Sequence, residues 1–407
     1  MKQSALLSIE AALDVIGSSI RPGPQETVAL GEALNRVLAA EVRAPSSVPP
    51  FDNSAMDGYA VRTEALDDAS ESTPVGLPVS GVSAAGEQVA ELASGACQRV
   101  FTGAPLPRGA DGVVMQEDVT VDEEGIAWFR EPLRPWRHVR FAGEDIEQGA
   151  RVSGVGDRVG PLELGVFSAV GLPSVPVRRR PKVAVIATGS ELKEPGVPLT
   201  GGAIYESNRV MLTSWLTALG AIPHPMPLVS DDPSELTRVL REAQEEMDFI
   251  LVTGGASVGD HDHSRDALEE AGGRTLFHRV AIKPGKPILF GALGSSAYFG
   301  LPGNPVSAMV TFQVFVIPAI RLWLGESTRG EETMRCDAGE DFSLKGDRVV
   351  FLRVTVDENG RALSAGPQGS HQLNAAMNAD GLLRLDPGVA IAKGAPIRVI
   401  PTRVWGC

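Results

Sequence analysis

Between Lys182 and about Gly325, strand-like and helix-like segments alternate along the chain. Short apolar runs such as 182–189 and 248–252 end in turns, and segments with helical spacing follow several of them. Such alternation is typical of an open sheet of parallel strands with helices between the strands. Ligands of these sheets bind beyond the carboxyl ends of the strands, where the connecting loops converge. This part of the chain is therefore the candidate catalytic domain.

Caps and periodicity predict the elements of this domain. We expect strands over 182–189, 222–229, 248–252 and 297–301, with the prolines of the second making it less regular. We expect helices over 208–219, 234–247 and 264–271. Ser230 or an aspartate caps the second of these helices, and Pro233 lies in its first turn. A last helix, with Asn304 as its cap and Pro305 at its first position, is apolar nearly all round and is therefore expected to be buried.

The loops at the expected carboxyl ends of the strands are all polar or rich in glycine. They are TGSE (188–191), SDDP (230–233), TGGASVG (253–259) and LPGNP (301–305). Gly254 and Gly255 form a turn that leaves backbone N–H groups bare, which suits an anion. Four such loops on one rim predict a ligand site.

The third of these loops continues as DHDHS (260–264), in which carboxylates alternate with histidines. Asp260 and Asp262 are hard oxygen donors next to the anion turn, so they suggest a divalent cation such as Mg²⁺ between protein and phosphate. The alternative is that Asp262 or Ser264 only caps the following helix. The spacing of His261 and His263 also suggests zinc, but the segment has no obvious third soft ligand.

The chain on both sides of this region consists mostly of short β-like runs and turns. Its 407 residues exceed what one core usually holds, which predicts several domains. Near the N-terminus we expect helices over 1–17, 31–40 and 161–169 and a strand over 26–30. The runs 98–103, 112–118 and 126–130 predict a small β domain. The runs 348–356, 390–394 and 396–404 predict a small antiparallel barrel or sandwich.

Charge and cysteine content exclude several classes of function. A formal net charge of -14 argues against general nucleic-acid binding, which needs a basic face. The cysteines are scattered, at Cys97, Cys336 and Cys407. Their spacing argues against disulfides and a thiolate zinc site, and favours a reducing compartment. The N-terminus is no signal peptide, and the most apolar run, 310–320, is short and broken by Gln313 and Pro318. We therefore expect a cytoplasmic protein that does not enter a membrane.

The segment VPPFDNSAMDGYA (48–60) is an irregular polar turn, because prolines open it and Asp-Gly closes it. Asp52, Asn53, Ser54 and Asp57 place several oxygens around one short loop. Such a loop is suited to bind a heterocycle or to hold a hydrated metal. The alternative is a turn whose side chains only cap its own backbone.

Eight motifs, in this order, resemble those of the molybdopterin molybdenumtransferases, the bacterial relatives of the gephyrin E domain. They are PPFDNSAMDGYAVR (49–62), FTGAPLPRGADGVVMQED (101–118), GED (143–145), TGSEL (188–192), SDDP (230–233), GGASVGDHD (254–262), AIKPGKP (281–287) and GLPGNPVSA (300–308). The motifs extend over most of the chain, which makes a chance resemblance improbable.

The resemblance implies an α/β multidomain protein with a doubly wound α/β catalytic domain. Small β-rich domains flank that domain, and a C-terminal β-barrel-like domain follows it. We expect an N-terminal or linker domain that forms the dimer (1–45 plus 141–175), a small β-rich domain (46–140), the α/β domain (176–328) and a C-terminal β domain (329–407).

The resemblance also implies an activity, substrates and partners. Members of the family insert molybdate into adenylylated molybdopterin with Mg²⁺ and release AMP. We expect an elongated homodimer and, as a further partner, a molybdopterin adenylyltransferase. Two alternatives remain. One is the sister enzyme of the same catalytic fold that adenylylates molybdopterin and consumes ATP. The other is a gephyrin-like dimeric scaffold that binds a peptide partner.

Site residues follow by matching the motifs position by position. The expected catalytic residues are Asp57, Asp145, Glu191, Asp231, Asp262 and Lys283, of which Glu191, Asp231 and Asp262 are the expected metal ligands. The expected substrate-binding residues include the two glycines of the anion turn. They are Thr102, Gly254, Gly255, Ser257, Arg279, Lys286, Pro302, Asn304, Arg353 and Ser370. Carboxylates would hold Mg²⁺, and Lys283 and Lys286 would neutralise the pyrophosphate.

Three positions depart from the family pattern. Arg279 stands where lysine is common, and it offers a planar fork in place of a point charge. Ala256 replaces a usual valine. Ser190 replaces a common aspartate, so one carboxylate near the expected site is absent.

Overall fold

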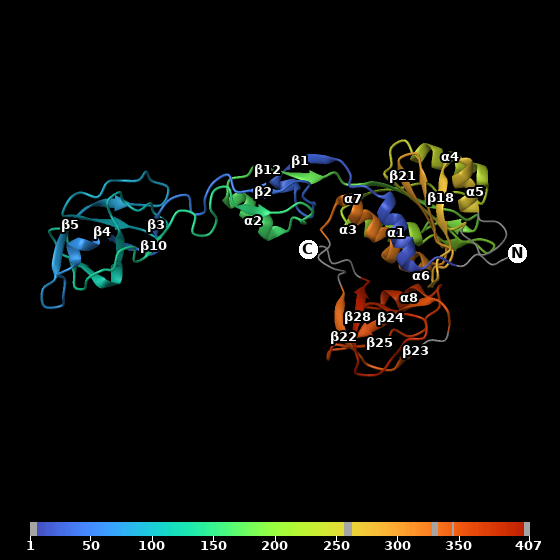
Figure 1. Cartoon of the computed structure of the whole chain (residues 1–407). Helices are drawn as coiled ribbons and strands as arrows, with labels where there is room; N and C mark the ends of the chain where they lie inside the picture. Colours follow the sequence, from blue (N-terminus) through green and yellow to red (C-terminus); the bar gives the residue numbers. More distant parts are fainter. Residues whose placement is uncertain (1–5, 256–262, 328–332, 344–345, 403–407) are drawn as a thin grey trace.

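The computed structural model describes residues 6–255, 263–327, 333–343 and 346–402. Figure 1 shows an elongated chain with a β-rich region at one end, a small linking region in the middle, and an α/β region beside a barrel at the other end. The predicted fold class is confirmed. The chain is a multidomain α/β protein with β-rich flanking regions and a C-terminal barrel.

A six-stranded sheet forms the centre of the α/β region. Its strand order is β16 (Ile222–Pro225), β13 (Lys182–Ala187), β17 (Phe249–Thr253), β21 (Ser296–Leu301), β20 (Leu289–Leu293) and β18 (Arg274–His278). The first four strands are parallel, as expected. β20 is antiparallel to both of its neighbours, so the sheet is mixed and not parallel throughout. The cause is the two-residue connection between β20 and β21, which permits only an antiparallel hairpin.

The sheet is doubly wound around β13. From β13 the chain runs through α3 (Asn208–Ala218) to β16 on one side, and then through α4 (Pro233–Ala243) to β17 on the other. Alternate residues of β13 face opposite layers: Val183 packs with α1 (Ile9–Ser19) and α3, whereas Ala184 packs with α4 and α5 (His263–Glu270). The loops after β13 and β17 are thus neighbours at the point where the winding reverses, which is where such sheets bind ligands.

Helix α4 begins as its sequence predicts. Asp232 is the N-cap, its carboxylate accepts the Ser234 N–H at 2.9 Å, and Pro233 is the first helical residue. The strand expected over 222–229 ends early as β16, because prolines alternate along this run and cannot donate to a sheet.

The apolar helix after Asn304 is longer than expected. It consists of α6 (Pro305–Thr311), the π-helical turn η4 (Phe312–Val316) and α7 (Ile317–Leu324). The π turn lies directly before Pro318, which cannot donate an N–H to the preceding turn. Contrary to our expectation, the resulting 20-residue helix contains an 18-residue window with a mean hydropathy of 1.6, so by length and composition alone it could cross a membrane. However, 72% of that window is buried inside the protein, as expected of a core helix in a folded domain.

In the linking region, strands that come before the β-rich region in the chain pair with strands that come after it. β1 (Gln25–Ala29) pairs with β12 (Ser174–Arg178), β2 (Val42–Arg43) pairs with β11 (Arg151–Ser153), and α2 (Pro161–Ala169) packs on them. The helix predicted over 31–40 is absent, and only the 3₁₀ turn η1 (Leu30–Glu32) forms there. Asn35 has φ 61, a left-handed conformation that ends any helix.

The far β-rich region is a curled sheet of short strands. Its order is β7 (Gly112–Met115), β4 (Gly58–Val61), β6 (Cys97–Val100), β5 (Val75–Ser83), β9 (Ile126–Phe129) and β8 (Val119–Val121). β3 (Asn53–Ser54) and β10 (Val139–Arg140) pair at its edge. Two 3₁₀ turns, η2 (Thr63–Leu66) and η3 (Gln116–Asp118), connect strands of this region.

The C-terminal region is a closed barrel. Its five strands, in order around the barrel, are β24 (Val349–Val356), β25 (Arg361–Ser364), β22 (Met334–Ala338), β28 (Pro396–Pro401) and β26 (Gly381–Leu385), which pairs back with β24. β23 (Phe342–Ser343) pairs with β27 (Ala390–Ile391), and α8 (Leu373–Met377) lies beside the α/β region (Figure 1).

The barrel shares a core with the α/β region. Val349 and Phe351 of β24 and Ala376 of α8 belong to the same buried cluster as α6 and α7. β19 (Ile282–Lys283), which carries the lysine loop, pairs with β24 in parallel. The two regions are therefore held against each other by packing and by a strand pair.

Candidate functional site

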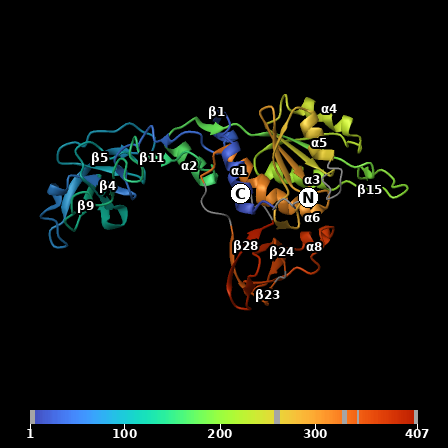
Figure 2. The same cartoon turned by 45° about the vertical axis from the view of Figure 1, so that its right-hand side comes forward.

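A cavity of about 930 Å³ lies beyond the carboxyl ends of β13, β17 and β21. Five predicted site residues line it: Glu191, Asp231, Gly254, Gly255 and Asn304. The segment around β14 (Leu192–Lys193) and β15 (Ile204–Tyr205) forms one wall and extends outward from the sheet (Figure 2). The cavity is our candidate active site because it lies at the winding reversal and gathers residues from four loops.

Both glycines of the turn after β17 have a positive φ, but a side chain at Gly254 would meet backbone, whereas one at Gly255 would meet a side chain. Gly254 has φ +93, and a Cβ there would lie 2.1 Å from the Thr188 carbonyl oxygen. Gly255 has φ +65, and a Cβ there would lie 3.1 Å from Thr188 Oγ1. The Thr188 N–H donates to the Thr253 carbonyl at 2.9 Å. The two loops therefore touch through their backbones, which only glycine permits at position 254.

The carboxylates of the rim are held by backbone contacts. Ser190 donates its N–H to Asp231 Oδ2 at 2.9 Å, and the Asp231 N–H donates to Ser190 Oγ at 3.2 Å. Ser190 thus links the loop after β13 to the loop before α4. A Cβ at Gly189 would lie 2.6 Å from Glu191 Oε2, so the glycine makes room for the Glu191 carboxylate.

Glu191 and Asp231 both contribute carboxylates to the lining of the cavity. Two carboxylates are enough for Mg²⁺, because substrate phosphates and waters complete its octahedral shell. Among the described residues no group of three or more histidine, cysteine or acidic side chains is arranged to hold a metal by itself. Asp262 and Ser257 lie outside the described residues, so the structure says nothing of the third predicted ligand.

A buried asparagine that sequence reasoning missed joins three parts of the cavity. Asn208 Nδ2 donates to Thr253 Oγ1 at 2.9 Å and to the Gly303 carbonyl at 2.7 Å, and Thr253 Oγ1 donates to the Pro302 carbonyl at 3.2 Å. Pro302 is buried and serves this network through its carbonyl. The available signal was the polar pair Ser207–Asn208 at the start of a helix that follows a wall of the site.

Three buried acceptor atoms around the cavity have no hydrogen-bond partner within the described residues. They are Asn208 Oδ1, Thr188 Oγ1 and Glu206 Oε2, and all three residues line the cavity. An unpaired buried acceptor typically costs about 1–3 kcal/mol. Buried polar groups that a protein leaves unpaired often mark functional sites.

The basic side of the predicted site lies between the cavity and the barrel. Lys283 is exposed on β19, and a Cβ at Gly285 would lie 2.5 Å from the Thr311 side chain, so the lysine loop packs on α6. Val306 of the same helix donates its N–H to the Ser370 carbonyl at 3.1 Å. Lys283 and Ser370 thus both lie beside α6, but neither lines the cavity.

Arg279 and Lys286 occupy the same loop region. Arg279 has φ +68, a strained conformation for an arginine, and donates its N–H to the Ile288 carbonyl. The Lys286 carbonyl accepts the Val280 N–H at 3.1 Å. Their side chains do not line the cavity either.

Arg353 is only 1% exposed and lies on the face of β24 that also carries Val349 and Phe351, which is the face toward the core shared with the α/β region. It donates to the Gly369 carbonyl at 3.0 Å and to the Pro367 carbonyl. Burial lowers the pKa of this guanidinium. In this position Arg353 contacts the loop that carries Ser370, not the cavity.

Asp57, Thr102 and Asp145 lie at the β-rich end of the chain, far from the cavity of the same chain (Figure 1). The Thr102 N–H and hydroxyl donate to Asp57 Oδ1 at 2.8 and 2.9 Å. These bonds, the backbone one first, lower the pKa of Asp57 although its carboxylate is exposed. Asp145 is also exposed, and its N–H donates to the Val48 carbonyl.

Replacing Thr102 with valine should raise the pKa of Asp57 partway toward its usual range. The backbone N–H remains while the hydroxyl donor is lost, and donors favour the ionised form. Because the shift in the native protein is downward, its stabilisation is present above the unfolded-state pKa and is lost as pH falls through the folded-state pKa. A carboxyl-carbon NMR titration measures the change. An unchanged Asp57 titration would show that the hydroxyl bond does not form in solution.

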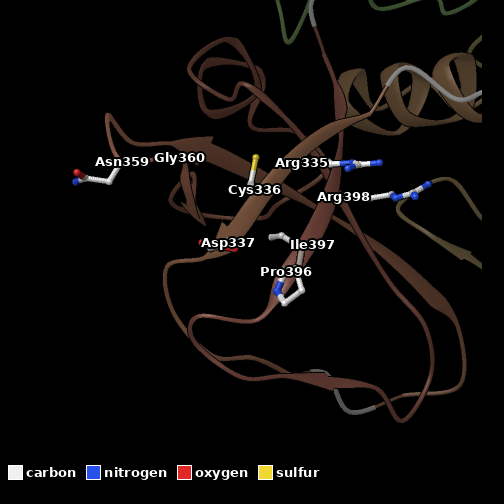
Figure 3. A pocket seen from close by; sticks show the side chains of 8 residues that line it. All are labelled: Arg335, Cys336, Asp337, Asn359, Gly360, Pro396, Ile397 and Arg398. Atoms are coloured by element: carbon white, nitrogen blue, oxygen red, sulfur yellow. The ribbon is translucent and has the colours of Figure 1, made fainter.

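A second hollow, of about 560 Å³, lies on the barrel. Figure 3 shows Arg335 of β22 and Arg398 of β28 pointing the same way from paired strands, with Cys336 beside them. None of the predicted site residues lines this hollow. We therefore do not assign the chemistry to it.

Three family models match the chain in order. The MoeA N-terminal region (domain I and II) matches residues 7–171, a probable molybdopterin binding domain matches 184–322, and the MoeA C-terminal region (domain IV) matches 335–402. These segments cover the β-rich end, the α/β region with its cavity, and the barrel.

Curated relatives and solved structures cover the chain as a whole. A molybdopterin molybdenumtransferase from Haemophilus influenzae is 38% identical over 87% of this chain and 88% of its own length. Molybdopterin molybdenumtransferase 2 from Mycobacterium tuberculosis is 37% identical over 96% and 98%. Two structures of the molybdopterin biosynthesis MoeA protein from Pyrococcus horikoshii have TM-scores of 0.86 and 0.83 and identities of 33% and 31%. They cover 98% and 97% of this chain and 100% and 99% of theirs.

Proposed function

Because this chain belongs to the MoeA family of molybdopterin molybdenumtransferases, enzymes of molybdenum cofactor biosynthesis, we propose that it inserts molybdate into adenylylated molybdopterin and releases AMP. The observation that carries the proposal is the cavity at the winding reversal. It combines a glycine turn suited to phosphate with the carboxylates of Glu191 and Asp231. A phosphoanhydride needs both features, an anion cradle and a way to hold a cation.

We assign Glu191 and Asp231 as the described ligands of Mg²⁺, with Asp262 as a third. A bound Mg²⁺ would stabilise charge on the phosphate oxygens as the anhydride is cleaved. Ser190 keeps Asp231 oriented through two hydrogen bonds. Lys283 and Lys286, on a loop that packs on α6, would supply positive charge from the barrel side.

We also propose a homodimer in which the β-rich region of one subunit completes the cavity of the other. The support is the separation of two groups of predicted site residues. Asp57 and Thr102 form a hydrogen-bonded pair at one end of the chain, and the cavity lies at the other (Figure 1). Two elongated subunits side by side would bring these groups together.

Complementation in mixed dimers tests this arrangement. We expect Asp57→Asn and Asp231→Asn to be nearly inactive alone. Subunits of the two variants, unfolded together and refolded at equal amounts, should recover about a quarter of wild-type activity. Random pairing makes about half of the dimers mixed, and half of the sites in each mixed dimer are intact. A monomeric mass by light scattering, or no recovery in dimers of confirmed mixed composition, would contradict the proposal.

The activity itself is tested with purified protein, adenylylated molybdopterin, molybdate and Mg²⁺. We expect AMP to appear in step with cofactor formation, and to depend on both molybdate and Mg²⁺. Consumption of ATP with free molybdopterin would instead identify the sister adenylyltransferase. Absence of both reactions would leave the scaffold alternative.

We propose that the reaction takes place in the cytoplasm. In support, Cys97 and Cys336 are free and buried, and burial raises the pKa of the Cys97 thiol to about 11. Unpaired thiols of this kind persist in a reducing compartment.

A further inference from the structure

We propose that His371, on a loop of the C-terminal barrel, contacts the phosphate of the substrate in the cavity of the α/β region, and that Arg353 is a positioning residue for this loop. The inference rests on the proposed function and adds to it a substrate contact from a separate domain. His371 is not part of any motif that sequence reasoning selected.

His371 reaches the cavity from the barrel. Of the described residues that line the cavity, it is the only one that follows α7 in the chain. Its side chain is exposed and makes no hydrogen bond with the described residues. It is therefore free to bind a ligand.

The chemistry of the cavity favours a phosphate contact for this histidine. The acidic side chains in its lining are Glu191, Glu206 and Asp231. The described lining contains no lysine or arginine, and its only side chains that can become cationic are His263 and His371. Because an imidazole N–H can donate to a phosphate oxygen, His371 offsets the acidic lining where the anion must sit.

The His371 loop is held by a buried arginine. The Arg353 guanidinium donates to the carbonyls of Gly369 and Pro367. The Gln368 side chain accepts the Arg353 backbone N–H at 2.9 Å and donates to the Arg353 carbonyl at 3.0 Å. Burying a guanidinium is costly. Its hydrogen bonds to the two loop carbonyls offset part of this cost, and they hold the loop in one position.

Further contacts fix the loop relative to the cavity. The Gly369 N–H donates to Gln372 Oε1 at 2.7 Å, which closes the turn around His371. The Ser370 carbonyl accepts the N–H of Val306. Val306 directly follows Pro305, and Pro305 lines the cavity. The shared core of the barrel and α6 holds both sides of this contact.

Calorimetric titration of the full-length protein with AMP and Mg²⁺ tests the contact. His371→Ala removes the imidazole donor and should weaken AMP binding about 10-fold or more, the usual loss for a hydrogen bond to a charged group. The same variant should raise the KM for adenylylated molybdopterin more than it lowers kcat. Asn374→Ala, an exposed change on α8 outside the cavity lining, is the matched control and should bind AMP normally.

Arg353→Lys keeps the charge and loses the planar fork, so the loop should lose its anchor. We expect AMP binding to weaken as in His371→Ala, and the double variant to be no worse than either single one, because both changes remove the same contact. Equal AMP affinity of His371→Ala and wild type would overturn the inference, and additive losses would overturn the role of Arg353. If Arg353→Lys does not fold, Gln372→Ala takes its place in the cycle.

The two proposals fail in different ways. If wild-type protein neither releases nor binds AMP, the proposed function is wrong. If wild type does both and His371→Ala behaves as wild type, only the present inference is wrong.

Discussion

Asp231→Asn should lower the rate of AMP release by about 100-fold or more, with little change in melting temperature. The amide retains the size of the side chain and an oxygen that accepts the Ser190 N–H, so the loop should keep its shape. What is lost is the negative charge on the cavity rim. The measurement is single-turnover AMP release at saturating substrate, with Mg²⁺ varied.

The neighbouring residue provides a matched control. Asp232→Asn removes a charge from the same loop, but Asp232 caps α4 and is not in the cavity lining. Asparagine caps helices as well as aspartate does, so we expect nearly normal activity and stability. Equal loss of activity in both variants would mean that the general charge of the loop matters, and not a ligand at Asp231.

Gly254→Ala should abolish activity and destabilise the α/β region by more than about 2 kcal/mol. Position 254 has φ +93, and the new Cβ would lie 2.1 Å from the Thr188 carbonyl oxygen. The clashing atom belongs to the backbone, which cannot move aside as the end of a flexible side chain could. The loops after β13 and β17 must therefore separate. That separation would open the anion turn. Differential scanning calorimetry and the AMP assay measure the two effects.

Gly272→Ala isolates the steric part of this effect. Gly272 has φ +95, almost the same conformation, but no atom lies within 4 Å of the Cβ that it would gain. We expect a loss of about 1 kcal/mol and normal activity. If Gly254→Ala were no worse than this control, the loops would be less tightly joined than the structure indicates.

The rim of the site could be predicted because its signals are local. Strand ends, glycine turns and the cap of α4 are each written in a few neighbouring residues, and the parallel sheet brings these ends together. The loops that carry Glu191, Asp231, Gly254 and Asn304 were found in this way, whereas Glu191, Asp231 and Asn304 were selected as site residues by their match to the family motifs. All four residues line one cavity. Asp262 and Ser257 stay predictions, because they lie outside the described residues.

The direction of β20 was missed because an apolar run does not reveal its strand partner. The signal that was present is the turn Gly294–Ser295 between two apolar runs, which is typical of a hairpin. The helix over 31–40 was predicted from composition. Its residues Val37 and Leu38 instead form bridges to Arg158 and Val177, far along the chain, which no local pattern shows.

The residues that sequence reasoning missed in the cavity depend on long-range contacts. His371 arrives there only because the barrel packs on α6, and Asn208 is buried only because three loops meet above it. Arg353 was selected by its match to the family, but its burial beside the loop that carries Ser370 could not be foreseen. A motif identifies a residue without telling which way its side chain points.

The core shared by the α/β region and the barrel also affects how the chain comes apart. If the barrel were separated from the α/β region, Val349, Phe351 and Ala376 of the barrel would lose their apolar neighbours, and β19 of the α/β region would lose its strand partner. Four domains in sequence therefore do not mean four independent cooperative units. The α/β region and the barrel should melt as one unit, while the β-rich region, with a hydrophobic cluster of its own, can unfold alone.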